Sequence, residues 1–98
     1  MTVNIDKRLN TIIQGHVQGV GFRYFVHGKA TGLGLTGWVR NRWDGSVEVL
    51  IEGKHTELEL LLDALYRGPR GATVTSVDPQ WKEATGEFLD FRVRMTAY

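Results

Sequence analysis

The run Gly15-His16-Val17-Gln18-Gly19-Val20-Gly21-Phe22-Arg23 holds the residues of this chain that are best suited to chemistry. Its three glycines allow positive φ angles and let the main chain approach a ligand closely. A loop of this kind that opens onto a helix directs several backbone N–H groups at one point, where an anion is favoured. Arg23 adds a planar guanidinium whose shape matches phosphate or carboxylate. The run therefore predicts an anion site built from backbone amides and one arginine.

Asn41 is a second candidate, because it lies near the end of a later strand, just before a turn. A side-chain amide donates and accepts together, so it can orient a water molecule beside a bound anion. Taken alone, each residue has an ordinary explanation. An asparagine before a turn is commonly a turn residue, and an arginine at a helix start is usually a solvated charge. The helix dipole disfavours a cation at that end, and an anion bound beside Arg23 would compensate for it.

Other reactive groups are scarce in this chain. It has no cysteine, which excludes thiol nucleophiles, disulfides and thiolate metal sites. The three histidines, His16, His27 and His55, do not have the spacing of metal ligands, and surface or capping roles explain them better. Asp44 precedes a glycine and fits a turn better than a catalytic acid.

The elements that must position these residues follow from the apolar pattern. In chain order we predict a strand over 8–17, a helix over 22–33, strands over 35–42 and 46–53, a helix over 57–67, and strands over 73–81 and 88–95. Asp44-Gly45 predicts a hairpin turn, and a further turn is expected around 84–86. The strand that carries Asn41 is expected to pair near the first strand.

The ends of the two helices have their own signals. Phe22, Val26 and Ala30 recur at helical spacing directly after the glycine loop. Thr56 with Glu59 forms a capping-box pattern that predicts the start of the second helix. A Gly-Pro pair at 68–69 predicts its end.

The order β-α-β-β-α-β, with the last strand region split in two, is that of the ferredoxin-like α/β sandwich of the α+β class. We therefore predict an antiparallel four- to five-stranded sheet with both helices on one face. A chain of 98 residues suits a single domain over 1–98. Residues 1–6 are polar and are expected to be flexible.

The composition is that of a soluble globular protein, with 42% hydrophobic and 23% charged residues. The net charge of +1 does not indicate a nucleic-acid partner. No apolar run is long enough for a membrane span or a secretory signal. We therefore expect a cytoplasmic protein that contacts neither membrane nor nucleic acid, and a monomer as the default at this size.

Two segments of the chain resemble the signatures of one family. Residues 13–23 resemble the first signature of the acylphosphatases, and residues 37–41, followed by 44–47 and Gly53, resemble the second. The spacing between the segments also fits, and the resemblance covers the chain from residue 8 to residue 94. Two signatures at compatible spacing are far more specific than the glycine run alone.

The resemblance implies hydrolysis of acyl phosphates to a carboxylate and inorganic phosphate, with no metal and no cofactor. It places the phosphate-binding arginine at Arg23 and the water-positioning asparagine at Asn41. It places a backbone phosphate cradle at Gln18, Gly19, Val20, Gly21 and Phe22. The implied partner is a small acyl phosphate, whose acyl group the sequence does not identify.

Two other functions stay open from the sequence. A non-catalytic module of the same fold could bind a phosphorylated ligand, as a domain of carbamoyl-transferring maturation proteins does within a larger assembly. Alternatively, Trp38, Arg40, Arg42 and Trp43 could contact RNA on a ferredoxin-like sheet. The aromatic-rich RNP pattern of such sheets is absent, however.

Overall fold

A computed structural model describes residues 6–96 of the chain. Its elements are, in order, β1 (Asp6–His16), α1 (Phe22–Gly32), β2 (Thr36–Asn41), β3 (Val47–Lys54), α2 (His55–Arg67), β4 (Thr73–Glu83) and β5 (Phe91–Val93). This is the predicted order, with most bounds within about two residues of the prediction. Residues 1–5 of the segment expected to be flexible lie outside the described residues, and Asp6 already belongs to β1.

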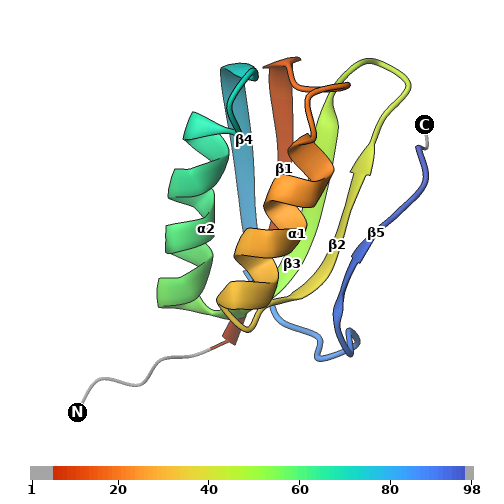
Figure 1. Cartoon of the computed structure of the whole chain (residues 1–98). Helices are drawn as coiled ribbons and strands as arrows, with labels where there is room; N and C mark the ends of the chain where they lie inside the picture. Colours follow the sequence, from red (N-terminus) through yellow and green to blue (C-terminus); the bar gives the residue numbers. More distant parts are fainter. Residues whose placement is uncertain (1–5, 97–98) are drawn as a thin grey trace.

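The five strands form one sheet in the order β4-β1-β3-β2-β5. Both helices cover the same face of this sheet, as predicted (Figure 1). The strand β2 pairs with β3 along 36–41, and β3 separates it from β1. The strand β2 thus lies near β1, as expected, but does not pair with it directly, because a strand joined by a short hairpin pairs with its own returning strand.

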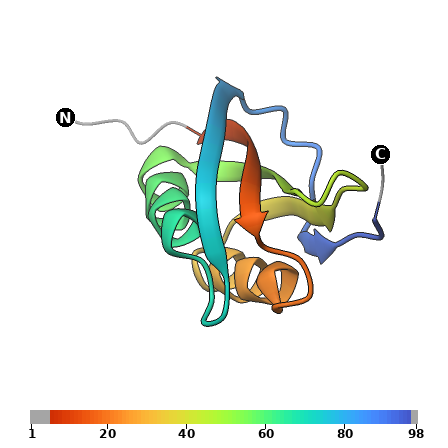
Figure 2. The same cartoon turned by 90° about the horizontal axis from the view of Figure 1, so that it is seen from above.

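The strand β5 departs from the predicted antiparallel sheet. It pairs in parallel with β2, so the sheet is mixed. The strand β4 pairs with β1 at the other edge, and residues 84–90 cross between the two edges on the face away from the helices (Figure 2). The turn expected around 84–86 thus begins a crossing, and the strand expected over 88–95 shortens to three residues. Alternation of apolar residues predicts a strand but not its neighbour, which explains the difference.

The core lies between the sheet and the two helices. Each helix buries one apolar stripe against alternate residues of the central strands, as a period of 3.6 requires. The largest fully buried side chains are Phe22, Leu9, Ile13, Ile51, Leu58, Leu61, Leu65, Val17, Val26, Val39, Val47 and Val49. Because Phe22 is among them, the first turn of α1 is fixed to the core, and the residues on either side of Phe22 are positioned with it.

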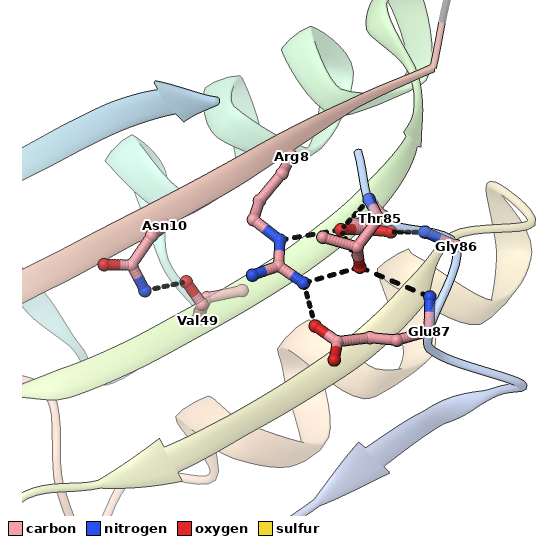
Figure 3. A network of polar contacts seen from close by, with 7 residues as sticks. Arg8, Asn10, Val49, Thr85, Gly86 and Glu87 are labelled. Atoms are coloured by element: carbon pink, nitrogen blue, oxygen red, sulfur yellow. Dashed lines mark hydrogen bonds and ion pairs between the residues drawn. The ribbon is translucent and has the colours of Figure 1, made fainter. Parts of the chain in front are cut away.

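A polar network holds the crossing segment to the open face of the sheet (Figure 3). The Glu52 carboxylate is 4% exposed and accepts hydrogen bonds from Arg8 Nε at 2.6 Å, and from the backbone N–H groups of Thr85 and Gly86 at 2.9 Å each. Arg8 also pairs with Glu87. Burial raises the pKa of Glu52, but the bonds from Thr85, Gly86 and Arg8 outweigh burial and hold its pKa below the ordinary value.

The helix α2 begins earlier than predicted. Its N-cap is Lys54, with no side-chain cap, so the capping box of Thr56 and Glu59 does not form. Thr56 instead lies within the helix and donates to Glu57 Oε2 at 2.6 Å. The strand β3 runs directly into the helix, which leaves no linker in which Thr56 could act as a cap. The helix has Gly68 as its C-cap, where its end was predicted. Among the described residues, no helix is long and apolar enough to cross a membrane.

Candidate active site

The loop over residues 17–21 joins β1 to α1 in a conformation that depends on glycine. Gly19 and Gly21 have φ angles of 75° and 76°, in the left-handed region that other residues rarely adopt. Gly21 is the N-cap of α1, and therefore offers no side chain to cap the helix. The first turn also contains no acidic residue. The amides that open α1 thus have no competing acidic group in their own turn, and they form a suitable anion site.

Gly15 has a different role from the other two glycines of the run. The register between β1 and β4 shifts between Gln14 and Gly15. A Cβ at Gly15 would lie 2.0 Å from the carbonyl oxygen of Thr73, so only glycine allows the two main chains to approach this closely. Gly15 therefore serves the end of the sheet, and the cradle begins later in the run.

Arg23 follows Phe22 in the first turn of α1, where it is half-buried. Its Nη1 donates to the carbonyl oxygen of Arg94 at 3.3 Å, just after β5. No carboxylate of residues 6–96 forms an ion pair with it. A neutral carbonyl thus orients the guanidinium without neutralising its charge, which is what an anion-binding arginine requires.

Asn41 is the last residue of β2, opposite Val47 of β3. The loop over 17–21 and the β2–β3 turn lie at the same end of the molecule (Figure 1). The Gln18 side chain connects them, because its Nε2 donates to the carbonyl oxygens of Arg42 at 2.8 Å and Ser46 at 2.9 Å. This connection fixes the position of Asn41 relative to the cradle.

The β2–β3 turn is closed by Asp44, as expected of a turn residue. Its Oδ1 accepts from Ser46 Oγ at 2.6 Å and from Ser46 N at 3.0 Å. These bonds, the hydroxyl first, lower the pKa of Asp44, so the carboxyl stays ionised and is unsuited to act as an acid.

A cavity of about 120 Å³ joins the predicted catalytic pair. It is lined by Val17, Gly19, Gly21, Phe22, Arg23, Tyr24 and Asn41. Arg23 and Asn41, 18 positions apart in sequence, thus face one space. Gln18 and Val20 belong to the same loop but do not line the cavity, and the side chain of Gln18 makes the connection described above.

Two lining residues were missed by the sequence reasoning. Val17 is a buried residue after the end of β1 and has no distinguishing signal. Tyr24 is a large side chain on the solvent side of the first turn, opposite the stripe of Phe22, Val26 and Ala30. An apolar residue at such a position is a signal that helical periodicity could have provided.

The polar groups around the cavity show no arrangement for a metal. No group of three or more His, Cys, Asp or Glu side chains in residues 6–96 could hold a metal ion. Arg42 follows Asn41 but does not line the cavity, and its buried Nε has no hydrogen-bond partner within residues 6–96. The cavity can therefore offer backbone amides, the Arg23 guanidinium and the Asn41 carboxamide.

Comparisons with known proteins identify the family of the chain. The family model described as Acylphosphatase matches residues 9–93. The acylphosphatase of Salinibacter ruber is 48% identical over 94 residues, which cover 96% of this chain and 99% of that protein. The acylphosphatase of Caldanaerobacter subterraneus is 46% identical over 89 residues, which cover 91% of this chain and 99% of that protein.

Solved structures give the same result for the fold. The crystal structure of acylphosphatase from Bacillus subtilis matches with a TM-score of 0.87 and 36% identity, over 90% of this chain and 98% of that one. A crystal structure of full-length HypF, in a phosphate- and nucleotide-bound form, matches with a TM-score of 0.86 and 26% identity. That match covers 98% of this chain but 13% of the HypF chain.

Proposed function

The chain belongs to the acylphosphatase family, and on that premise we propose that it hydrolyses small acyl phosphates in the cavity between α1 and the end of β2. The family consists of hydrolases of acylphosphatase type, and the activity is that of the family. The roles of individual residues are our proposal. The observation that supports them is that Arg23 and Asn41 line one cavity with Gly19 and Gly21.

In this proposal the phosphoryl group binds in the cradle of residues 18–22. The backbone amides at the start of α1 donate to its oxygens, and Arg23 donates through its planar fork. Charge in a phosphoryl-transfer transition state is spread over these oxygens, so fixed donors stabilise it without rearranging. The uncapped helix start and the unneutralised guanidinium supply these donors.

Asn41 holds the attacking water. Its carboxamide has no useful pKa, so it acts by accepting from and donating to the water rather than as a base. The water oxygen forms a bond to phosphorus while the bond from phosphorus to the acyl oxygen breaks, and the carboxylate leaves with the electron pair. Holding the water in line removes much of the entropic barrier to this step.

No acid is needed at the leaving group, because a carboxylate is already stable as an anion near neutral pH. The proton released by the water passes to a phosphoryl oxygen, and the products are a carboxylate and inorganic phosphate. Neither step requires a metal or a cofactor, so hydrolysis is expected to continue in excess EDTA. Loss of activity that added Mg²⁺ or Zn²⁺ restores would contradict this part of the proposal.

A structure with inorganic phosphate, the shared product, tests the site directly. Phosphate is expected within hydrogen-bond distance of the amides of 19–23 and of the Arg23 guanidinium, with the Asn41 carboxamide facing phosphorus. Phosphate bound elsewhere, or Asn41 directed away from it, would overturn the assignment. Benzoyl phosphate hydrolysis by the same preparation serves as the control for a correctly folded enzyme.

The likeness to part of HypF favours a second candidate, a non-catalytic module that binds a phosphorylated ligand. Such a module would bind phosphate and fail to hydrolyse benzoyl phosphate, so the same assay distinguishes the two. We also propose a cytoplasmic monomer that folds as one domain over 1–98.

We further propose that the protein does not bind RNA. The Trp38 ring on the open face is accompanied by the guanidinium groups of Arg40, at 4.6 Å from the ring centroid, and Arg94, at 5.1 Å. A base that stacked on this ring would have to displace them. Salt-dependent RNA binding would contradict this proposal.

A further inference from the structure

Resting on the function proposed above, we infer that Tyr24 contacts the acyl group of the substrate and gives the enzyme a preference for aromatic over small acyl groups. No signature residue has this role, because the predicted site consists of groups that bind phosphate or water. The inference depends on the size of the cavity, on the position of Tyr24 in α1 and on the exposure of its ring.

The size of the cavity indicates where the acyl group must lie. A volume of about 120 Å³ is well below the ~300–1,000 Å³ of pockets that enclose a whole drug-sized ligand. The phosphoryl group and the attacking water take up this space in the proposed mechanism. A benzoyl group therefore extends out of the cavity and lies against the protein surface beside it.

Tyr24 is the lining residue best placed to meet that group. It is 75% exposed, whereas the lining residues Val17 and Phe22 are buried at 1% and 2%. Side chains of a helix lean towards its N-terminus. Tyr24 lies in the first turn of α1, so its ring leans towards the cradle at Gly21.

The reaction geometry adds a direction to this argument. In-line displacement places the leaving oxygen on the side of phosphorus away from the attacking water. Asn41, which holds that water, reaches the cavity from the end of β2, whereas Tyr24 reaches it from α1. The acyl group leaves on the side of phosphorus away from Asn41, and therefore away from β2. The exposed apolar surface that it can meet there is supplied by Tyr24 of α1.

Tyr24 has no evident structural duty that would explain its presence. Within residues 6–96 its hydroxyl makes no hydrogen bond and its ring makes no aromatic contact. Its position lies off the buried stripe of Phe22, Val26 and Ala30. Truncation of the side chain should therefore leave the fold intact, so that kinetics report on substrate contact.

The test compares kcat/KM for benzoyl phosphate and acetyl phosphate in Tyr24→Ala, Tyr24→Phe and a matched control, Tyr66→Ala. Tyr66 is 53% exposed on α2 and does not line the cavity. An aromatic pair at a partly exposed site predicts that Tyr24→Ala lowers the value for benzoyl phosphate by about fivefold, and that for acetyl phosphate by less than about twofold. Tyr24→Phe, which keeps the ring, should retain the wild-type ratio, and so should Tyr66→Ala.

The outcomes separate this inference from the function on which it rests. An unchanged benzoyl-to-acetyl ratio in Tyr24→Ala, or an equal fall for both substrates, would overturn the role of Tyr24 while leaving the phosphate site intact. Inhibition by inorganic phosphate, which has no acyl group, should be the same in Tyr24→Ala as in the wild type. If Arg23→Ala hydrolysed both substrates at the wild-type rate, the proposed phosphate site would fail, whatever the result at position 24. If the wild type hydrolysed neither substrate, the proposed function itself would fail.

Discussion

The two ends of the sheet use polar groups in opposite ways. At the start of β1, the buried Glu52 carboxylate accepts bonds from Arg8, Thr85 and Gly86, and its charge is matched by a guanidinium. At the other end, Arg23 meets a backbone carbonyl and no carboxylate of the described residues, and α1 begins without a side-chain cap. The first end is satisfied within the chain, whereas the second holds donors that a ligand can satisfy.

This difference separates stability from activity. A buried carboxylate with its bonds made stabilises the position of the crossing segment, and removing one partner leaves a desolvated group unpaired. Donors that are fixed but unpaired contribute little to folding, yet they stabilise charge that develops in a transition state. Changes at the two ends should therefore affect different measurements.

The largest effect is expected from Arg23→Ala. Loss of the charged fork should lower kcat/KM for benzoyl phosphate by about 10³-fold, or about 4 kcal/mol of transition-state stabilisation. Stability to urea should not fall, because a cation at a helix N-terminus is unfavourable by about 0.3–1 kcal/mol. Arg70 is an exposed arginine after α2, and the control Arg70→Ala should match the wild type in kcat/KM and in stability to urea. Undiminished inhibition by phosphate in Arg23→Ala would contradict the assignment of Arg23 to the end of the sheet that binds the ligand.

Glu52→Ala should have the opposite effect to Arg23→Ala: it should lower stability and leave catalysis almost unchanged. Breaking a buried ion pair should lower the free energy of unfolding by about 3 kcal/mol, which urea denaturation measures. Well below the melting temperature, kcat per folded molecule should stay near the wild-type value. The exposed pair of Lys7 and Glu83 offers the control Glu83→Gln, which should cost less than about 1 kcal/mol. If Glu52→Ala also lowered the free energy of unfolding by less than about 1 kcal/mol, the network would not be what holds the crossing segment.

Asn41→Ala sharpens the comparison within the active end. Removal of the water-holding amide should lower kcat by about 100-fold, or about 2.7 kcal/mol. The inhibition constant for phosphate should be almost unchanged, because Arg23 and the cradle still bind the product. Steady-state kinetics with phosphate as competitive inhibitor measure both quantities. Weaker phosphate binding at an unchanged kcat would assign Asn41 to binding instead.

The smallest effect concerns the pH dependence of stability. The pKa of Glu52 is lowered in the folded protein, so its contribution is present above the unfolded-state pKa of about 4.3 and is lost as pH falls through the folded value. Between about pH 6 and pH 3, the wild type should therefore lose more stability than Glu52→Gln, which cannot titrate there. Urea titrations at several pH values measure the difference, and parallel curves for the two proteins would exclude this role.

Local signals were enough to predict much of the site. Left-handed backbone at Gly19 and Gly21 follows from residue type, and the stripe that begins at Phe22 places Arg23 in the first turn of α1. The turn at Asp44-Gly45 likewise follows from local chemistry and places Asn41 at a strand end. That the two residues share one cavity was predicted through the family resemblance, because no local rule connects residues 18 positions apart.

Most of the missed features depend on contacts between distant segments. The parallel pairing of β5 with β2 and the Glu52 network require residues 84–93 to cross the sheet. Gly15 belongs to the run from which the anion site was predicted, but its role depends on the neighbouring main chain at Thr73. The start of α2 depends on how directly β3 leads into it, a boundary that the capping pattern did not predict.

The sequence by itself determined the element order and the ferredoxin-like arrangement, because these follow from residue type, periodicity and short spacing. Through the family resemblance it also predicted which residues bind phosphate and water. Only the tertiary structure decided which edge β5 joins, what holds the crossing segment and that Tyr24 stands beside the cavity. These features arise from pairing and burial between segments far apart in the chain, and hydrophobic pattern does not distinguish among partners of equal polarity.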